Sequence, residues 1–343
     1  MKMTPKHIAF MAMAFLALSS CERKGPQEED YGTAISFDLD LERTDTKVTM
    51  FDEDGCLTDT GKGGGNFRLN AYFSDTDQVV IDNARVSYTN WVGVWGWWFR
   101  DERGTPDDDL DDVLVNYYWP FGYDLDFFGY MPKDLDRTSV TIDDYSAEKG
   151  PSFSCDLPLD NSGQDGLQEF IYAYTDDYNK NISSGSVPLQ FKHPFACVVF
   201  RLGESHRIKI NGIQLTGLYS TGTFNHADGW TGSGERNKTL DISVGKTVPD
   251  QINYNSLIGG PYIVMPQDFS AGTGTEKLVF NYDYQGATGL SGEISINILS
   301  AKWEPGKKYI YTIHRGDHGE EVVFKVQIEE WNVIGYTNEV EVQ

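Results

Sequence analysis

Carboxylates are the most abundant side chains in this sequence that could do chemistry. The chain carries 52 Asp and Glu residues against 28 Lys and Arg residues, which gives a formal net charge of −24 at pH 7. The acidic run at 107–112 offers several carboxylates to a hard cation such as calcium, but it lacks the alternating ligands and the glycine of a calcium-binding loop. We therefore interpret this run as a solvated acidic loop and predict no metal site.

Motifs of catalysis are absent from the sequence. It contains neither Gly-x-Ser-x-Gly nor His-Glu-x-x-His, and the glycine-rich stretch 61–65 does not have the spacing of a phosphate-binding loop. Acidic residues are many, yet no feature singles out a pair for glycoside hydrolysis. We predict a protein that is not an enzyme and needs no cofactor. The negative charge also excludes nucleic acid as a partner, because phosphates would be repelled.

One cysteine near the N-terminus has the surroundings of a lipid attachment site. Two lysines precede an apolar stretch, 8–18, that is about half as long as a membrane-spanning helix, so residues 1–20 are predicted to be a signal peptide. The ending Leu-Ser-Ser-Cys is similar to a bacterial lipobox, in which the chain is cut before the cysteine and the thiol is lipidated. We predict that Cys21 begins a lipidated polar tether, residues 21–32. The alternative is ordinary signal cleavage, with this cysteine as a bystander.

Three further cysteines, Cys56, Cys155 and Cys197, follow in the sequence. An odd number allows at most one disulfide within the chain, and the lack of a Cys-x-x-Cys pair argues against a structural zinc site. A chain of this length can fold around its own core without disulfides. We expect at least one of the three to be a buried free thiol.

Short alternating runs separated by turn residues recur along the chain and predict an all-β fold. The most regular run is 33–41, in which Ile35, Phe37, Leu39 and Leu41 face one way and polar residues face the other. Further strands are predicted at 67–73, 198–202, 208–210 and 278–282, and a hairpin is predicted from 309–313 and 321–328.

The small residues at 183–186 separate an aromatic, acidic part of the chain from a more regular part. This change of composition predicts a domain boundary. We expect two tandem β-sandwich domains, residues 33–186 and residues 187–343.

A cluster of four tryptophans, Trp91, Trp95, Trp97 and Trp98, could serve either the surface or the core. Exposed tryptophans form platforms for sugar rings, so a surface protein could bind a glycan through them. Core packing of the N-terminal domain is the alternative that we favour. Because Trp97 and Trp98 are adjacent, they point to opposite faces of a strand, and one of them is expected at the surface or at an interface.

Several segments spread over nearly the whole chain carry a resemblance when they are taken in order together with the Leu-Ser-Ser-Cys motif. They are 118–120, 125–132, 187–196, 213–224, 264–267, 303–313 and 326–331. In this order they are similar to the fimbrillins of Bacteroidetes, the superfamily of major and minor (Mfa-type) fimbrial subunits and their Bacteroides relatives. The resemblance does not distinguish a stalk subunit from a tip or an accessory subunit.

The resemblance implies two β-sandwich domains of transthyretin-like topology and a lipoprotein of the outer membrane that is displayed on the cell surface. It also implies an arginine-specific protease that removes the lipidated segment with the first strand, and a strand from another fimbrial subunit that fills the gap. Arg43 lies two residues after the end of the strand 33–41 and is the predicted cleavage site. At the C-terminus, Tyr336, Val340 and Val342 are candidate anchors of a donor strand.

Two alternatives stay open at this point. Arg43 could be a loop residue that is never cut, in which case the first strand stays in place. The chain could instead be a monomeric surface lipoprotein that binds a glycan through its tryptophans. In either case its expected role is adhesion, with a host or bacterial surface glycan or protein as a further partner.

Overall fold

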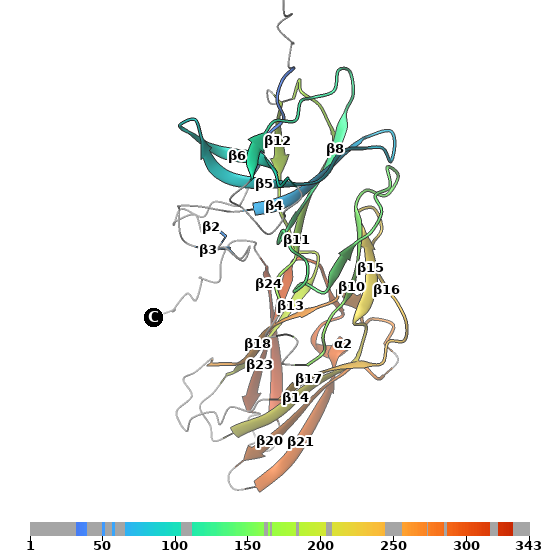
Figure 1. Cartoon of the computed structure of the whole chain (residues 1–343). Coiled ribbons are helices and arrows are strands. Elements are labelled where there is room, and N and C mark those ends of the chain that lie inside the picture. The colour runs from blue at the N-terminus through green and yellow to red at the C-terminus, as the bar shows by residue number, and fades with distance from the viewer. Residues whose placement is uncertain are drawn as a thin grey trace, which may run out of the picture.

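The structure is a computed structural model, and it describes residues 32–39, 50–51, 57–58, 66–103, 112–160, 164, 167–182, 185–203, 208–243, 256–272, 274–284, 287–315 and 322–331. Strands dominate these residues (Figure 1). A six-stranded sheet lies at one end of the molecule and a pair of four-stranded sheets lies at the other (Figure 1). No helix within the described ranges has both the length and the apolar character needed to cross a bilayer.

The N-terminal part is built on the six-stranded sheet. Its strands, all antiparallel to their neighbours, are in spatial order β11 (Ile171–Tyr178), β8 (Leu125–Met131), β4 (Asn66–Phe73), β5 (Val79–Trp91), β6 (Val94–Asp101) and β7 (Val113–Val115). In β4, Phe67, Leu69 and Ala71 are buried on one face, whereas Asn66 and Arg68 are buried on the other. The sheet is therefore covered on both faces.

The apolar face is covered by β1 (Ser36–Leu39) and β12 (Ser186–Leu189), which pair in parallel along their whole length. The two layers enclose the first core. Its buried members from the strands include Phe67, Leu69, Val86, Phe99, Leu125, Phe127, Ile171, Val187 and Leu189. Burial of these side chains is the main force that holds the two layers together.

The opposite face of the same sheet is partly covered by a four-stranded antiparallel sheet. Its strands are, in spatial order, β16 (Gly229–Gly232), β15 (Thr221–Asn225), β10 (Ser152–Asp156) and β9 (Val140–Ile142). Phe153 and Phe224 stack with their ring centroids 4.6 Å apart, and both contact Tyr172 of β11. Because β9 and β10 precede β12 in the chain while β15 and β16 follow it, this sheet joins the two halves of the sequence.

The C-terminal part is a sandwich of two four-stranded sheets. One contains, in spatial order, β18 (Ser256–Val264), β13 (Ala196–Leu202), β23 (Lys307–Arg315) and β24 (Val322–Glu330), and the other contains β17 (Lys238–Ser243), β14 (Ile208–Leu218), β20 (Lys277–Tyr284) and β21 (Ala287–Ser295). Val198, Phe200 and Leu202 of β13 lie in the core between them. Phe200 stacks on Tyr311, whose hydroxyl accepts a 2.9 Å hydrogen bond from Nε1 of the buried Trp303.

Shorter elements complete the described structure. β19 (Gln267–Asp268) pairs with β22 (Lys302–Trp303), and β2 (Met50–Phe51) pairs with β3 (Leu57–Thr58). The segment α2 (Ile296–Leu299) is a single helical turn that follows β21. None of these elements contributes to the groove described below.

The all-β prediction is confirmed. The strands predicted from alternation correspond to β4, β13, β14 and β20, and the predicted hairpin is the antiparallel pair β23–β24. The division at residue 186 stays a prediction. That position lies within β12, and Val187 and Leu189 on its far side pack into the first core.

Candidate functional site

The first strand of the described chain lies in a groove formed by the first core and by the backbone of two other segments, 117–119 and β12. Before β1 begins, Ile35 donates its N–H to the carbonyl of Tyr117 at 2.8 Å, and Trp119 donates to the carbonyl of Thr33 at 3.0 Å. From Ser36 onward the strand pairs in parallel with β12. Each of these bonds can be made by the backbone of any strand, so the groove does not require this particular sequence for its hydrogen bonds.

The side chains of this strand alternate between the core and the solvent. Ile35 is buried, Phe37 and Leu39 are half-buried and pack against the first core, and Ser36 and Asp38 are exposed. The structure therefore brings three of the predicted first-strand residues to one face. Their role in strand exchange stays a prediction.

Phe37 contacts three aromatic rings of the first core. Its ring meets Phe99 at 5.2 Å, Phe67 at 5.9 Å and Phe127 at 6.4 Å between centroids, each with an edge-on geometry. These three partners come from β6, β4 and β8, so one side chain touches three strands of the six-stranded sheet. Edge-on aromatic pairs are favourable beyond the area that they bury. Phe37 therefore links the first strand to the middle of the six-stranded sheet.

Trp119 forms the end of the groove where the strand begins. It is buried, and its indole Nε1 donates a hydrogen bond to the carbonyl of Gly185 at 3.3 Å. Its ring packs edge-on against Phe127 at 5.5 Å. Gly185 has a φ of +83°, and a side chain there would come within 2.9 Å of the indole. The sequence did not indicate that Trp119 closes this end of the groove, although the segment 118–120 contributed to the family resemblance.

The other predicted parts of the exchange mechanism fall on residues beyond the described ranges. They are Cys21, Leu41, Arg43, Tyr336, Val340 and Val342. Lipidation, cleavage and strand donation at these positions stay predictions.

The tryptophan cluster lies on the hairpin formed by β5 and β6. Its two-residue turn places Val92 at a φ of +50° and Gly93 at +86°, which suits the right-handed twist of a hairpin. The side chain of Asn90 accepts a 2.9 Å hydrogen bond from the N–H of Gly93. Val92 has 89% of its surface exposed, so the turn presents an apolar tip to solvent.

The adjacent tryptophans point to opposite faces, as predicted from their spacing. Trp97 packs at 5.3 Å from both Phe67 and Tyr88 and belongs to the edge of the first core. Trp98 lies on the other face, where it meets Trp91 edge-on at 4.8 Å. For Trp95 the structure gives only a strand position, opposite Asn90. The possible platform is thus limited to a half-exposed pair, Trp91 and Trp98.

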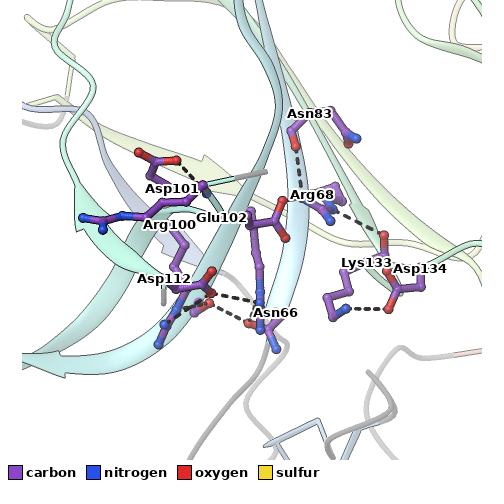
Figure 2. Close-up of polar contacts among 12 residues, drawn as sticks. Asn66, Arg68, Asn83, Arg100, Asp101, Glu102, Asp112, Lys133 and Asp134 are labelled. Atoms are coloured by element: carbon purple, nitrogen blue, oxygen red, sulfur yellow. Dashed lines mark hydrogen bonds and ion pairs between the residues drawn. The ribbon is translucent and has the colours of Figure 1, made fainter. Parts of the chain in front are cut away.

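The face of the sheet that carries Trp98 also carries a buried network of charged and polar side chains (Figure 2). Arg85 lies 3.1 Å and Arg100 lies 3.6 Å from Oδ2 of Asp112, and both Arg85 and Asp112 are almost fully buried. Arg100 Nε donates to Ser87 Oγ at 2.9 Å, and Ser87 donates to Asn66 Oδ1 at 2.6 Å. Two arginines around one carboxylate neutralise charge that would otherwise be costly to bury.

A second ion pair continues the network. Arg68 lies 2.7 Å from Glu102 and also donates to the backbone carbonyl of Asn83 at 3.3 Å (Figure 2). Glu102 and Asp112 therefore fix two points of the segment after β6 to the sheet. The expectation of a solvated acidic loop is wrong for Asp112, because it is buried against two arginines, while 104–111 lie outside the described ranges. Nothing in the residue run alone distinguished this last aspartate from its neighbours.

The described part of the chain holds no group of three or more His, Cys, Asp or Glu residues placed to bind a metal ion. Cys155 and Cys197 are free and buried, and burial raises the pKa of each thiol to about 12. Such thiols stay protonated and are poor nucleophiles. A cavity of about 420 Å³ beside Cys155 is lined by mixed polar and apolar residues and brings no catalytic arrangement with it. Cys56 lies outside the described residues.

With the groove and the hairpin in place, the chain can be compared with known proteins. A family model described as fimbrillin-like matches residues 113–331, which is more than half of the chain. This chain belongs to the fimbrillin-like family. The family predicted from the sequence segments is therefore confirmed. Membership assigns the chain to the fimbrial proteins of the cell surface, which associate with other fimbrial subunits and are structural proteins.

Solved structures of low sequence identity share the fold of this fimbrillin-like chain. A fimbrial protein from Bacteroides vulgatus is 14% identical, with a TM-score of 0.55, over 87% of this chain and 99% of that one. A candidate cell adhesion protein from Bacteroides uniformis is 15% identical, with a TM-score of 0.51, over 89% of this chain and 100% of that one. A comparison with curated proteins gave no match.

Proposed function

We propose that this fimbrillin-like chain is a fimbrial subunit that assembles by strand exchange and serves adhesion. In this proposal an arginine-specific protease cuts after Arg43, β1 leaves its groove, and a strand of another subunit takes its place. The observation that carries the proposal is the position of β1. It packs against the first core through Phe37, yet it comes from a segment whose next core strand, β4, begins only at Asn66. A cut between them leaves the six-stranded sheet continuous.

The groove sets the requirements for an incoming strand. It needs apolar side chains at alternate positions to replace Ile35, Phe37 and Leu39, and backbone groups to pair with β12. In the C-terminal tail, Tyr336, Val340 and Val342 share one face of an extended strand. This spacing supports the tail of a neighbouring subunit as the donor.

We also propose that the precursor is held on the outer membrane by a lipid on Cys21, with its folded part on the cell surface. Several acyl chains on one residue hold a protein firmly on a bilayer, because each buried CH₂ contributes about 0.8 kcal/mol. Mass spectrometry of the mature chain tests this directly. A mature N-terminus without acyl groups would refute the anchor and leave the groove unaffected.

The decisive experiment is limited digestion of the signal-free protein with an arginine-specific protease. We expect a single early cut after Arg43, detected by mass spectrometry, followed by a ladder of oligomers on an unheated gel and in size exclusion. The Arg43→Ala variant should lose both the cut and the ladder. Arg23 is a competing site upstream, but a cut there would free the lipid without removing the strand, so the Arg23→Ala variant should keep both.

The groove supplies a second check on the same experiment. After cleavage, the released segment must dissociate before exchange, and Phe37 resists this step through its three aromatic contacts. Phe37→Ala should therefore accelerate the ladder, whereas the exposed Asp38→Ala should not. A cut chain that stays monomeric in both variants would refute strand exchange.

A monomeric glycan-binding lipoprotein is the second candidate function. The half-exposed edge-on pair of Trp91 and Trp98 supports it, because such a pair offers an aromatic surface next to solvent. Binding of uncleaved chain to a glycan array should then fall with Trp91→Ala and survive in Arg43→Ala. Trp97 is not a suitable test residue, since its ring packs in the core.

A further inference from the structure

One end of the N-terminal part exposes a group of large apolar side chains. In the loop between β7 and β8, Phe121 has 88% of its surface exposed, Tyr123 has 58% and Tyr118 has 39%. Ile182, in the turn between β11 and β12, has 42% exposed. We call these four residues the end patch. Contiguous exposed apolar patches mark interaction sites more often than apolar residues scattered singly over a surface do.

The end patch is held in place by contacts beneath it. Lys180 Nζ lies 5.4 Å from the centroid of the Phe121 ring, which links the two segments that carry the patch. Tyr123 packs on Phe73 of β4 at 4.9 Å. Gly185, which follows Ile182 in the same turn, accepts the hydrogen bond from the buried Trp119. The patch is therefore presented by anchored loops.

The position of the end patch relative to the start of the fold indicates what it contacts. Ala34 forms a bridge with Tyr118, and Thr33 bonds to Trp119, so the N-terminal segment leaves the fold directly beside the patch. Figure 1 shows the described chain beginning at the same end of the molecule as the loop before β8. The ten residues between Cys21 and Gly32 can span at most roughly 35 Å.

We propose that the end patch rests in the headgroup region of the bilayer that holds the lipidated N-terminus, as long as β1 is still in its groove. The inference depends on the lipid anchor at Cys21 that was proposed above. Aromatic side chains favour the membrane–water interface, and Lys180 can extend its ammonium group toward the headgroups. Because the whole chain carries a net charge of −24, contact must come from apolar insertion, and anionic headgroups should weaken it.

The test uses the full lipidated chain carrying Arg43→Ala, reconstituted in phosphatidylcholine vesicles whose acyl chains are brominated to quench tryptophan. Phe121→Trp adds a fluorophore in the patch. Val92→Trp is the matched control, because Val92 is equally exposed at the tip of the β5–β6 hairpin. We expect brominated lipid to quench most of the emission added by Phe121→Trp and none of that added by Val92→Trp. Phosphatidylglycerol in the vesicles should reduce the quenching.

A second substitution tests whether the patch acts as one surface. Tyr123→Ser in the Phe121→Trp chain removes a neighbouring aromatic and should lower the docking constant on the order of tenfold, seen as loss of quenching. Equal quenching of the two tryptophan variants would overturn the inference. So would an emission change that depends on protein concentration and not on brominated lipid, since that would indicate contact between copies. A chain without acyl groups would overturn the anchor, and the inference with it, whereas an acylated chain without quenching would overturn the inference alone.

Discussion

Truncating Phe37 is the most direct perturbation of the groove. The half-buried ring contacts Phe67, Phe99 and Phe127, which lie on three strands of the six-stranded sheet. Phe37→Ala removes these contacts and leaves a hole where the three strands meet. The backbone bonds between β1 and β12 are unaffected, so the change tests the side chain alone.

The magnitude follows from the burial of the ring. A Phe→Ala change in a closed core costs about 3–5 kcal/mol, and partial exposure of Phe37 lowers this to about 2–3 kcal/mol. If the loss falls on the docking of β1, the strand should leave a cleaved chain about 30- to 150-fold faster, because each 1.4 kcal/mol changes an equilibrium tenfold. The exposed Asp38→Ala should change either quantity by less than about 0.5 kcal/mol.

Two assays measure the effect. Urea unfolding followed by tryptophan fluorescence gives the loss of stability in the first core, since Trp97 and Trp119 both lie there. Native mass spectrometry of the cleaved chain follows the release of the strand over time. Because the chain has more than one core, the unfolding curve should be fitted with more than one transition.

Two outcomes of these assays would contradict the role of Phe37. If Phe37→Ala and Asp38→Ala release the strand at the same rate, the aromatic pocket does not hold β1 and backbone pairing must do so. If Phe37→Ala unfolds the C-terminal sandwich together with the first core, the groove is not the weak point of the molecule. Either result would refute the assignment of Phe37 as the residue that retains the strand.

Three further predictions concern charged and titratable groups. Arg85→Ala should lower the unfolding midpoint by about 4–8 °C in differential scanning calorimetry, because it removes about 2 kcal/mol by leaving Asp112 with one arginine partner. Cys155 and Cys197 should resist iodoacetamide at pH 8 in the folded chain and react in denaturant, as peptide mapping would show, because burial raises the pKa of each to about 12. Burial, and then the positive charge of Lys192, lower the pKa of His226. The stability that depends on the neutral imidazole is therefore present above about pH 6.5 and is lost as pH falls below that value. His226→Gln should reduce the difference in unfolding midpoint between pH 7 and pH 5.

The first of these predictions has a control variant in the same chain, and each of the three has an outcome that would contradict it. Lys277 pairs with Glu293 at 2.7 Å on the surface, so Lys277→Ala should cost less than about 1 kcal/mol, and the effect should shrink in salt. Equal losses of stability in Lys277→Ala and Arg85→Ala would contradict the expectation that a buried ion pair costs more to break than a surface one. Labelling of either thiol in the folded chain would indicate that its core opens on the time scale of the reaction. A pH profile that His226→Gln leaves unchanged would assign the acid sensitivity to carboxylates.

Local pattern was enough to predict the strands and the face that each presents. Alternation at 33–41 correctly placed Ile35, Phe37 and Leu39 on one side, because period-2 burial needs no knowledge of the partner strand. The partner could not be predicted in this way. β1 pairs with β12, which lies some 150 residues later, and no local signal specifies a parallel pair at that distance.

The sequence pattern did not indicate that charged residues on the six-stranded sheet are buried. Arg68 and Arg85 look like surface residues in a strand, yet a four-stranded sheet and the segment around Glu102 and Asp112 cover that face. Burial on both faces of an antiparallel strand arises from a third layer, which is a tertiary feature. This is also why the last aspartate of the acidic run was wrongly placed in solvent.

The same layering indicates that the remaining sheet would stay paired if β1 were removed, as the proposed strand exchange requires. Every strand of the six-stranded sheet has its ladder partners within that sheet, and its outer face is held by the third core and the arginine network. β1 has no ladder with those six strands, and in the described residues it pairs with β12 and with the backbone at 117–119. Its removal would expose one apolar strip together with the backbone groups of β12 and of 117–119, and would leave the sheet beneath them paired. In the proposed mechanism, such an exposed surface would favour capture of a strand from another subunit, because it offers unpaired backbone groups and apolar positions to any strand with the right alternation.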